Sequence, residues 1–225
     1  MITLNIQVDL AGRQALLAAG ERIAVVQAMD SQPVNIVVAA VFDPFGDTTA
    51  VGFYPQWQGY VMQGAAQPES PVNMQITAAI NAGQQLTFDG SQLGNSQGAY
   101  TPTVFGLVNA SGNGNLSAGL ARQLNIANAD VWATIAIAGF PENTTAYFTP
   151  LVDVFVFLVS GVATGEVLPA TILQPLGASL KGGLQPVAGT PGLVGNYLDV
   201  PLTANTTIYY DDTTNCFAAG PLGGN

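Results

Sequence analysis

Carboxylates are the side chains with which this chain could perform acid–base chemistry. Its 14 acidic residues stand beside only four cationic ones, and histidine is absent. No imidazole can therefore act as general base or proton shuttle near neutral pH, and Ser-His or Cys-His nucleophilic sites are excluded. Paired carboxylates can perform glycoside-type catalysis. The sequence offers four candidates for such a pair: Asp153, Glu166, Asp211 and Asp212.

Asp153 is the strongest of these candidates, because it interrupts the most apolar segment of the chain, Leu151–Val159. Strand alternation would place it on one face with Leu151, Phe155 and Phe157. A carboxyl group buried in such surroundings holds its proton more tightly than in water. The alternative is a charge at a strand end or sheet edge that prevents pairing with another chain.

Oxygen-rich segments are the only candidates for a metal site, and calcium is the metal they would suit. The candidate ligands lie in two segments, one with Asp43 and Asp47 and the other with Asp211 and Asp212. Neither segment has the ligand spacing of an EF-hand loop, and both are also typical of turns. The chain cannot supply the ligands of a zinc site, because it has no histidine and Cys216 is its single cysteine. We expect neither a metal nor a cofactor.

A group of aromatic and amide side chains is the strongest candidate for a binding site. Flat rings beside amide groups suit a neutral sugar or a lipid headgroup. Packing in the core or against another subunit would use the same large rings. The predicted ligand-binding residues are Tyr54, Gln56, Trp57, Gln58 and Tyr60.

Charge restricts the partners that the chain can have. The net charge is −10, and only 8% of the residues are charged, against roughly 25% in typical domains. Nucleic acids and anionic lipids are disfavoured, because lysines and arginines supply most of the affinity for them. A weakly charged, amide-rich surface favours neutral carbohydrates, neutral lipid headgroups or copies of the same chain, so we expect a homo-oligomer.

The elements that must position these residues are mostly strands. Apolar and polar residues alternate in Ile2–Val8, and short Val/Ile/aromatic runs recur between Gly, Pro, Asn and Asp breaks about every ten residues. One short helix is predicted over 11–19, capped by Asp9 and ended by Gly20. The pattern predicts an all-β fold, an antiparallel β-sandwich that could close into a barrel-like form.

The whole chain, 1–225, is predicted to be a single β-rich domain, with a split near 110–115 as the alternative. A Gly/Pro-rich loop is expected around 176–197. Two residue runs, Arg22–Met29 and Val34–Phe42, are expected to form a hairpin across the break Asp30–Pro33.

The N-terminal segment alternates in polarity and does not resemble a signal peptide. No apolar run approaches the about 20 residues of a spanning helix. We therefore expect a cytoplasmic protein without a transmembrane segment, and release without a signal peptide stays open.

Three functions remain compatible with these residues. The first is a non-catalytic binding or self-assembling protein that recognises neutral glycans or lipid headgroups. The second is a cofactor-independent enzyme that uses carboxylates and tyrosines. The third is a structural or storage protein whose low charge permits dense packing.

Overall fold

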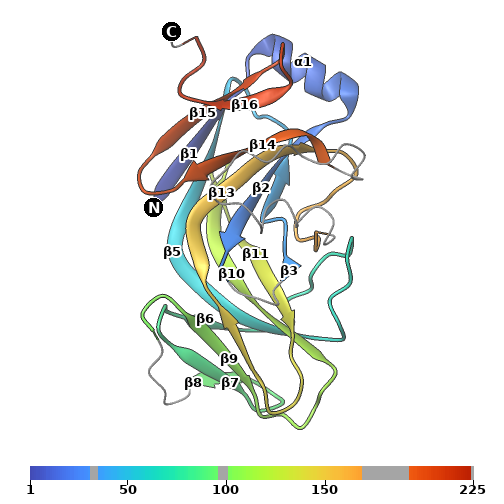
Figure 1. Ribbon diagram of the computed structural model, residues 1–225, viewed down its shortest axis with the longest axis vertical. Helices are drawn as coiled ribbons and strands as arrows, with labels where there is room; N and C mark the ends of the chain where they lie inside the picture. Colours follow the sequence, from blue (N-terminus) through green and yellow to red (C-terminus); the bar gives the residue numbers. More distant parts are fainter. Residues whose placement is uncertain (31–34, 96–100, 169–192, 224–225) are drawn as a thin grey trace.

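The computed structural model describes residues 1–30, 35–95, 101–168 and 193–223. Strands dominate it, and one short helix lies near the N-terminus, which confirms the all-β prediction. A strongly curled sheet faces two smaller sheets (Figure 1). Among the described residues, no helix has the length and apolar character needed to cross a membrane.

The large sheet has eight strands in the order β16-β15-β1-β5-β10-β11-β3, with β6 also paired to β5. Most neighbours are antiparallel, but β1 and β15 run parallel. Its strands are β1 (Ile2–Gln7), β3 (Asn35–Ile36), β5 (Thr48–Gln63), β6 (Ile76–Ile80), β10 (Leu116–Ile126), β11 (Ala129–Gly139), β15 (Thr206–Asp211) and β16 (Cys216–Ala219).

Each of the two smaller sheets has four strands, and together they cover the inner side of the curled sheet (Figure 1). The first has the order β14-β13-β2-β4; the second has the order β12-β9-β7-β8, in which β7 and β9 are parallel. The strands of the first are β2 (Arg22–Met29), β4 (Ala40–Phe42), β13 (Pro150–Val159) and β14 (Leu193–Pro201). Those of the second are β7 (Gln85–Phe88), β8 (Leu93–Asn95), β9 (Phe105–Asn109) and β12 (Thr145–Phe148).

The main core lies where the three sheets meet. It combines Leu120 and Leu124 of β10 with Val25 of β2, Val156 of β13 and Leu107 of β9, all of which are buried. Alternating residues of each strand enter this core and leave the others on the opposite face, as a period of two requires. A side chain that faces the core is therefore inaccessible to a ligand, whereas one on the opposite face can be accessible.

Helix α1 (Leu10–Ala19) begins and ends as its sequence predicts. The Asp9 carboxylate accepts a hydrogen bond of 2.7 Å from the Gly12 N–H, which satisfies one of the free donors of the first turn. Gly20 ends the helix with φ +68°, a conformation that glycine adopts without a Cβ penalty. The helix starts one residue before the predicted range.

Strand β5 is a single long strand of 16 residues. On β10, Arg122 pairs with Trp57 and Leu124 pairs with Phe53, so β5 has two extra residues in this interval. Pro55 lies within this bulge, where a residue without an N–H costs no ladder hydrogen bond. Because the number of extra residues is even, the alternation of faces is unchanged, and Phe53 and Trp57 both face the inner core.

Two expectations need correction. The 34–42 run is not one strand, because β4 pairs with β2 whereas β3 joins the large sheet through β11. The loop expected at 176–197 lies outside the described residues as far as 192, and its last residues belong to β14.

Candidate functional site

The predicted group around Trp57 lies entirely on β5, but the structure divides it between two faces. Tyr60 is buried, and its hydroxyl donates to the Ala136 carbonyl at 2.9 Å. Gly119 leaves room for this contact, since a Cβ there would lie within 2.2 Å of the Ala136 oxygen. Burial raises the pKa of the Tyr60 hydroxyl. Tyr60 therefore holds strands together and is not accessible to a ligand.

Trp57 is half-buried and packs against protein groups on the inner face. Its ring lies 5.2 Å from that of Phe105 on β9, and the Arg122 Cζ lies 5.0 Å from its centroid. Arg122 is also 5.2 Å from the Phe53 centroid. Stacking of a guanidinium on aromatic faces is favourable, and more so when it is partly desolvated.

Arg122 connects the large sheet with the sheet that contains β2. Its Nε donates to the Tyr54 carbonyl and its Nη1 donates to Gln27 Oε1, each at 2.9 Å. The Gln27 amide in turn donates to the Leu151 carbonyl of β13 at 2.7 Å. Burial lowers the pKa of Arg122 to about 10, a value at which it stays charged near neutral pH. Sequence reasoning missed this residue, because its partners lie on β5 and β2, which are far from it in the chain.

Tyr54, Gln56 and Gln58 are the members of the group that lie away from the core. Gln56 is exposed, and Tyr54 and Gln58 are half-buried. The Tyr54 hydroxyl donates to Asp130 Oδ1 at 3.2 Å. Partial desolvation and the nearby Asp130 charge raise the pKa of Tyr54.

Asp153 is half-buried and has a second carboxylate nearby. It pairs with Pro201 of β14, and Asp199 lies two residues along the same strand, diagonally across from it. Desolvation and the Asp153 charge raise the pKa of Asp199. Strand β13 lies between β14 and β2, so Asp153 is not on an edge strand. It is the fourth residue of β13 (Pro150–Val159), so the alternative of a charge near a strand end stays a prediction. Neither carboxylate lines the pocket described below.

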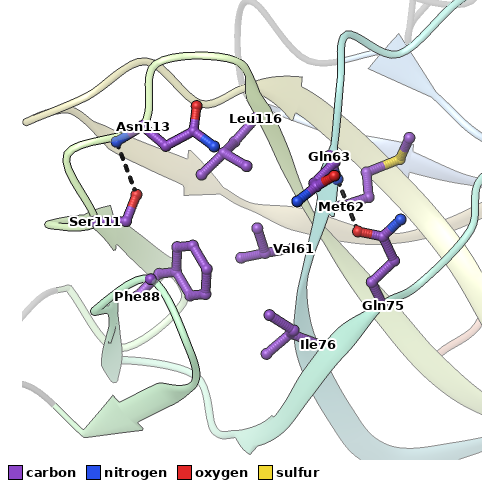
Figure 2. Close-up of a pocket in the computed structure, with 10 residues that line it drawn as sticks. Val61, Met62, Gln63, Gln75, Ile76, Phe88, Ser111, Asn113 and Leu116 are labelled. Carbon is purple, nitrogen blue, oxygen red and sulfur yellow. Dashed lines mark hydrogen bonds between the residues drawn. The ribbon is translucent and has the colours of Figure 1, made fainter.

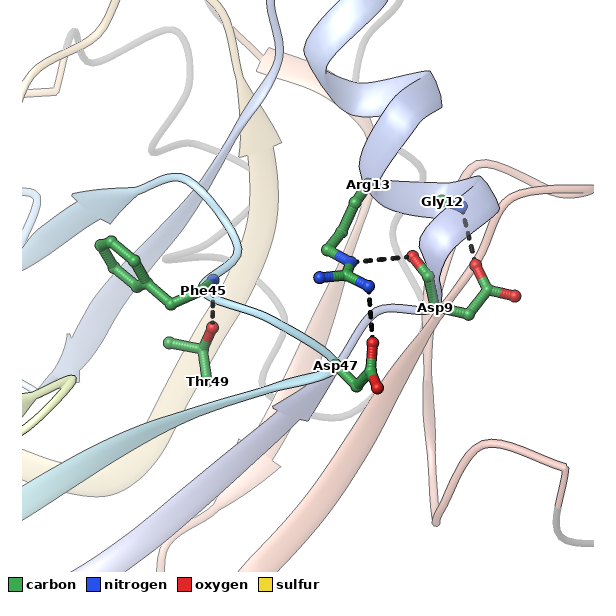
Figure 3. A network of polar contacts seen from close by, with 6 residues as sticks. All are labelled: Asp9, Gly12, Arg13, Phe45, Asp47 and Thr49. Carbon is green, nitrogen blue, oxygen red and sulfur yellow. Dashed lines mark hydrogen bonds and ion pairs between the residues drawn. The ribbon is translucent and has the colours of Figure 1, made fainter.

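Two of the calcium candidates form ion pairs with arginines. Asp47 Oδ1 lies 2.6 Å from Arg13 Nη2, in the network that also fixes the start of α1 (Figure 3). Asp43 Oδ1 lies 3.3 Å from Arg22 Nε, although without hydrogen-bond geometry, so that contact is ionic only.

The other calcium candidates belong to a turn. Asp211 accepts hydrogen bonds from the Thr213 and Thr214 hydroxyls at 2.6 and 2.9 Å, which lower its pKa, and Asp212 is exposed. Within the described ranges, no group of three or more His, Cys, Asp or Glu could hold a metal ion.

A pocket of about 150 Å³ lies at the other end of β5, between the large sheet and the β7–β9 sheet (Figure 2). Apolar side chains form part of its wall, namely Val61, Met62, Ile76, Phe88 and Leu116. Gly90 and four polar residues contribute the remainder; the polar residues are Gln63, Gln75, Ser111 and Asn113. None of the ten lining residues is ionisable.

Buried Asn109 fixes one side of this pocket. Its amide donates to the Phe140 carbonyl at 2.7 Å and to the Asn113 carbonyl at 2.8 Å. Its Oδ1 accepts from the Ser111 hydroxyl at 2.6 Å. Asn113 N–H donates to Ser111 Oγ at 3.2 Å (Figure 2). An otherwise open Gly-rich turn is thus held in one conformation.

The opposite side and the floor are also fixed by hydrogen bonds. Gln63 N–H donates to Gln75 Oε1 at 3.0 Å, which joins β5 to the segment before β6 (Figure 2). Below, Asp89 accepts from the N–H groups of Ser91 and Gln92 at 2.8 and 2.9 Å. These bonds lower the pKa of Asp89 to about 2, so the turn after Phe88 keeps its charged cap at ordinary pH.

The sequence contains one signal for this pocket, the Gly-rich segment Ser111–Asn115. It lacks the lysine of a phosphate-binding loop, and its composition is typical of a hairpin turn. The structure shows that the turn also lines a cavity, because Gln63, Gln75 and Phe88 come from separate segments that fold beside it.

Comparison of the chain with known protein families, with curated proteins and with solved structures gives no match.

Proposed function

We propose that this protein binds a neutral polyhydroxy ligand, a single sugar unit, in the pocket formed by Gln63, Gln75, Phe88, Ser111 and Asn113. The observation that carries the proposal is the composition of the pocket wall: a ring and aliphatic groups beside amides and a hydroxyl, without any ionisable side chain. A pyranose has the matching chemistry, since its C–H groups suit apolar surface and its hydroxyls both donate and accept hydrogen bonds.

The size and neutrality of the pocket also favour this class of ligand. Its volume of about 150 Å³ is below the about 300–1,000 Å³ of sites for drug-sized molecules, which favours one ring over an oligomer. A phosphate or a lipid headgroup would normally be held by a cation or a helix N-terminus. The pocket lining offers neither of these, so a neutral sugar is preferred over a zwitterionic headgroup.

The test is calorimetric titration of a panel of neutral monosaccharides into the protein and into Gln63→Ala. Gln63 is exposed, so this change should leave folding intact, and affinity should fall about tenfold through loss of hydrogen bonds. Gln14→Ala, an exposed glutamine on α1, is the matched control and should bind as the parent does. Equal affinity of the parent and Gln63→Ala would overturn the proposal.

A further inference from the structure

A second surface with the chemistry of a carbohydrate site lies on the outer face of the large sheet. On β10 and β11, Gln123 is paired with Trp132, and Asn125 is paired with Asp130. Their neighbours Leu124 and Ala133 enter the core, so alternation places these four residues on the opposite face. Tyr54 of β5 reaches the same face, because its hydroxyl contacts Asp130.

The carboxylate at the centre of this face is held by two donors. Asn125 Nδ2 donates to Asp130 Oδ1 at 2.6 Å, and the Tyr54 hydroxyl donates to the same oxygen at 3.2 Å. No bond from the described residues occupies Oδ2. Asp130 therefore presents one oriented acceptor to solvent, and its position is fixed before any ligand arrives.

Trp132 supplies a large apolar surface beside this acceptor. Its side chain is 37% exposed and lies two residue pairs along the β10–β11 ladder from Asp130, on the same face. An indole face can cover the C–H face of a pyranose ring while a neighbouring carboxylate and amide bind its hydroxyls. We infer that Tyr54, Gln123, Asp130 and Trp132 form a binding surface for a linear neutral glycan.

Charge favours this occupant over the other classes of partner. Neither Lys nor Arg is among the residues of this surface, and the chain carries a net charge of −10, so an anionic polymer or an anionic membrane would be repelled. Along the ladder this face is closed at one end, since the next pair on the same side, Ala121 and Thr134, is buried. The exposed part, in contrast with an enclosed cavity, can accept a chain that runs across the strands.

This surface is separate from the pocket. Leu116, which lines the pocket, precedes Gln123 by 123 − 116 = 7 residues on β10, which corresponds to about 23 Å at the usual strand rise. Leu116 also belongs to the core side of β10, whereas Gln123 is on the outer side. The inference therefore goes beyond the proposed function and stands or falls without it.

Affinity electrophoresis in gels that contain a linear neutral polysaccharide tests this inference. The probes are mannan, amylose and a β-1,4-glucan, each in a separate gel. The protein should be retarded in at least one of them, and Trp132→Ala should show at least about tenfold weaker retardation there. Phe45→Ala removes an aromatic side chain that is 54% exposed elsewhere, and it should be retarded like the parent.

Two further variants separate this surface from the pocket and from self-association. Gln63→Ala should retain its retardation if the outer face binds the glycan, even where the pocket proposal fails. Asp130→Asn should weaken retardation and remain folded. Equal retardation of Trp132→Ala and the parent, or none in any gel, would overturn the inference. So would a change in sedimentation of Trp132→Ala without loss of retardation, since that result would identify the face as a contact between copies.

Discussion

The two tryptophans of the chain lie on the same curled sheet but face in different directions. Trp57 contacts Phe105 and Arg122 on the inner face, whereas Trp132 is 37% exposed on the outer face. The sequence drew attention to Trp57, because it is one of four aromatic residues between positions 53 and 60, and no role was predicted for Trp132. The face to which each side chain points decides which of the two can meet a ligand.

This difference teaches that an aromatic cluster in the sequence need not be a cluster in space. Tyr54 and Tyr60 lie on the same side of β5 but differ in burial: one contacts exposed Asp130, and the other is fully buried. Packing on the inner face accounts for Trp57, whereas Tyr60 packs on the opposite face in a separate cluster with Ala121 and Ile137. The surfaces available for binding are the pocket beyond Tyr60 and the outer face beside Tyr54.

The largest expected effect comes from removing each tryptophan in turn. Trp57→Ala should lower the free energy of unfolding by about 3 kcal/mol, because it removes a packed ring where three sheets meet. Trp132→Ala should change it by less than about 0.5 kcal/mol. Urea unfolding followed by circular dichroism measures both values. Similar costs for the two variants would break the comparison.

Arg122 provides the next largest effect. Arg122→Met should lower the free energy of unfolding by about 2 kcal/mol, since it leaves the Gln27 and Tyr54 acceptors without their donor. Arg122→Lys keeps the charge but not the planar fork, and it should recover only part of the loss. Chemical denaturation of both variants checks this order, and full recovery by lysine would show that charge alone matters.

The two tyrosines should differ by a smaller amount. Tyr60→Phe removes a buried hydroxyl and leaves the Ala136 carbonyl with one fewer donor, so stability should fall by about 1 kcal/mol. Tyr54→Phe removes an exposed contact and should change stability by less than about 0.5 kcal/mol. Thermal unfolding of the pair makes the measurement. A greater loss in Tyr54→Phe would contradict the assignment of Tyr60 as the buried and Tyr54 as the accessible hydroxyl.

The smallest effect concerns the carboxylates of β13 and β14. The pKa of Asp199 is raised in the folded state, so the folded protein binds this proton more tightly than the unfolded chain does. The stability gained from that proton is fully present below the unfolded pKa and is lost as pH rises through the folded pKa. Asp199→Asn should therefore be more stable than the parent near neutral pH, by at most about 0.5 kcal/mol after solvent screening. Urea unfolding at about pH 3 and about pH 7 tests this, since the advantage should vanish at the lower pH. If Asp199→Asn were more stable than the parent only at the acidic pH, the pKa of Asp199 would be lowered in the folded state, which would contradict the prediction.

Local signals in the sequence predicted the local structure. Asp9 and Gly20 fixed the ends of α1 because capping depends on neighbours within a few residues. Alternation in Ile2–Val8 predicted β1 for the same reason. Pairing of β1 with β15 depends on contacts across the whole chain, for which no short pattern exists.

The candidate sites were less accessible to sequence reasoning. The pocket combines Gln63, Gln75, Phe88 and Ser111 from segments that are adjacent only after the sheets pack. The outer surface combines Tyr54 of β5 with residues of β10 and β11 that lie far from it in the chain. Residue types suggested a neutral polar partner, but only tertiary structure determines which amides and rings share a surface.

Chemical-shift mapping of the isotopically labelled protein with neutral monosaccharides tests the central claim most directly. The amide resonances of Gln63, Ser111 and Asn113 should shift in a saturable manner with at least one sugar, while those of α1 stay unchanged. A phosphorylated form of the same sugar should bind more weakly, because the pocket offers no cation. An absence of shifts at these three residues, or saturable shifts confined to other parts of the chain, would contradict the assignment of this pocket as a sugar site.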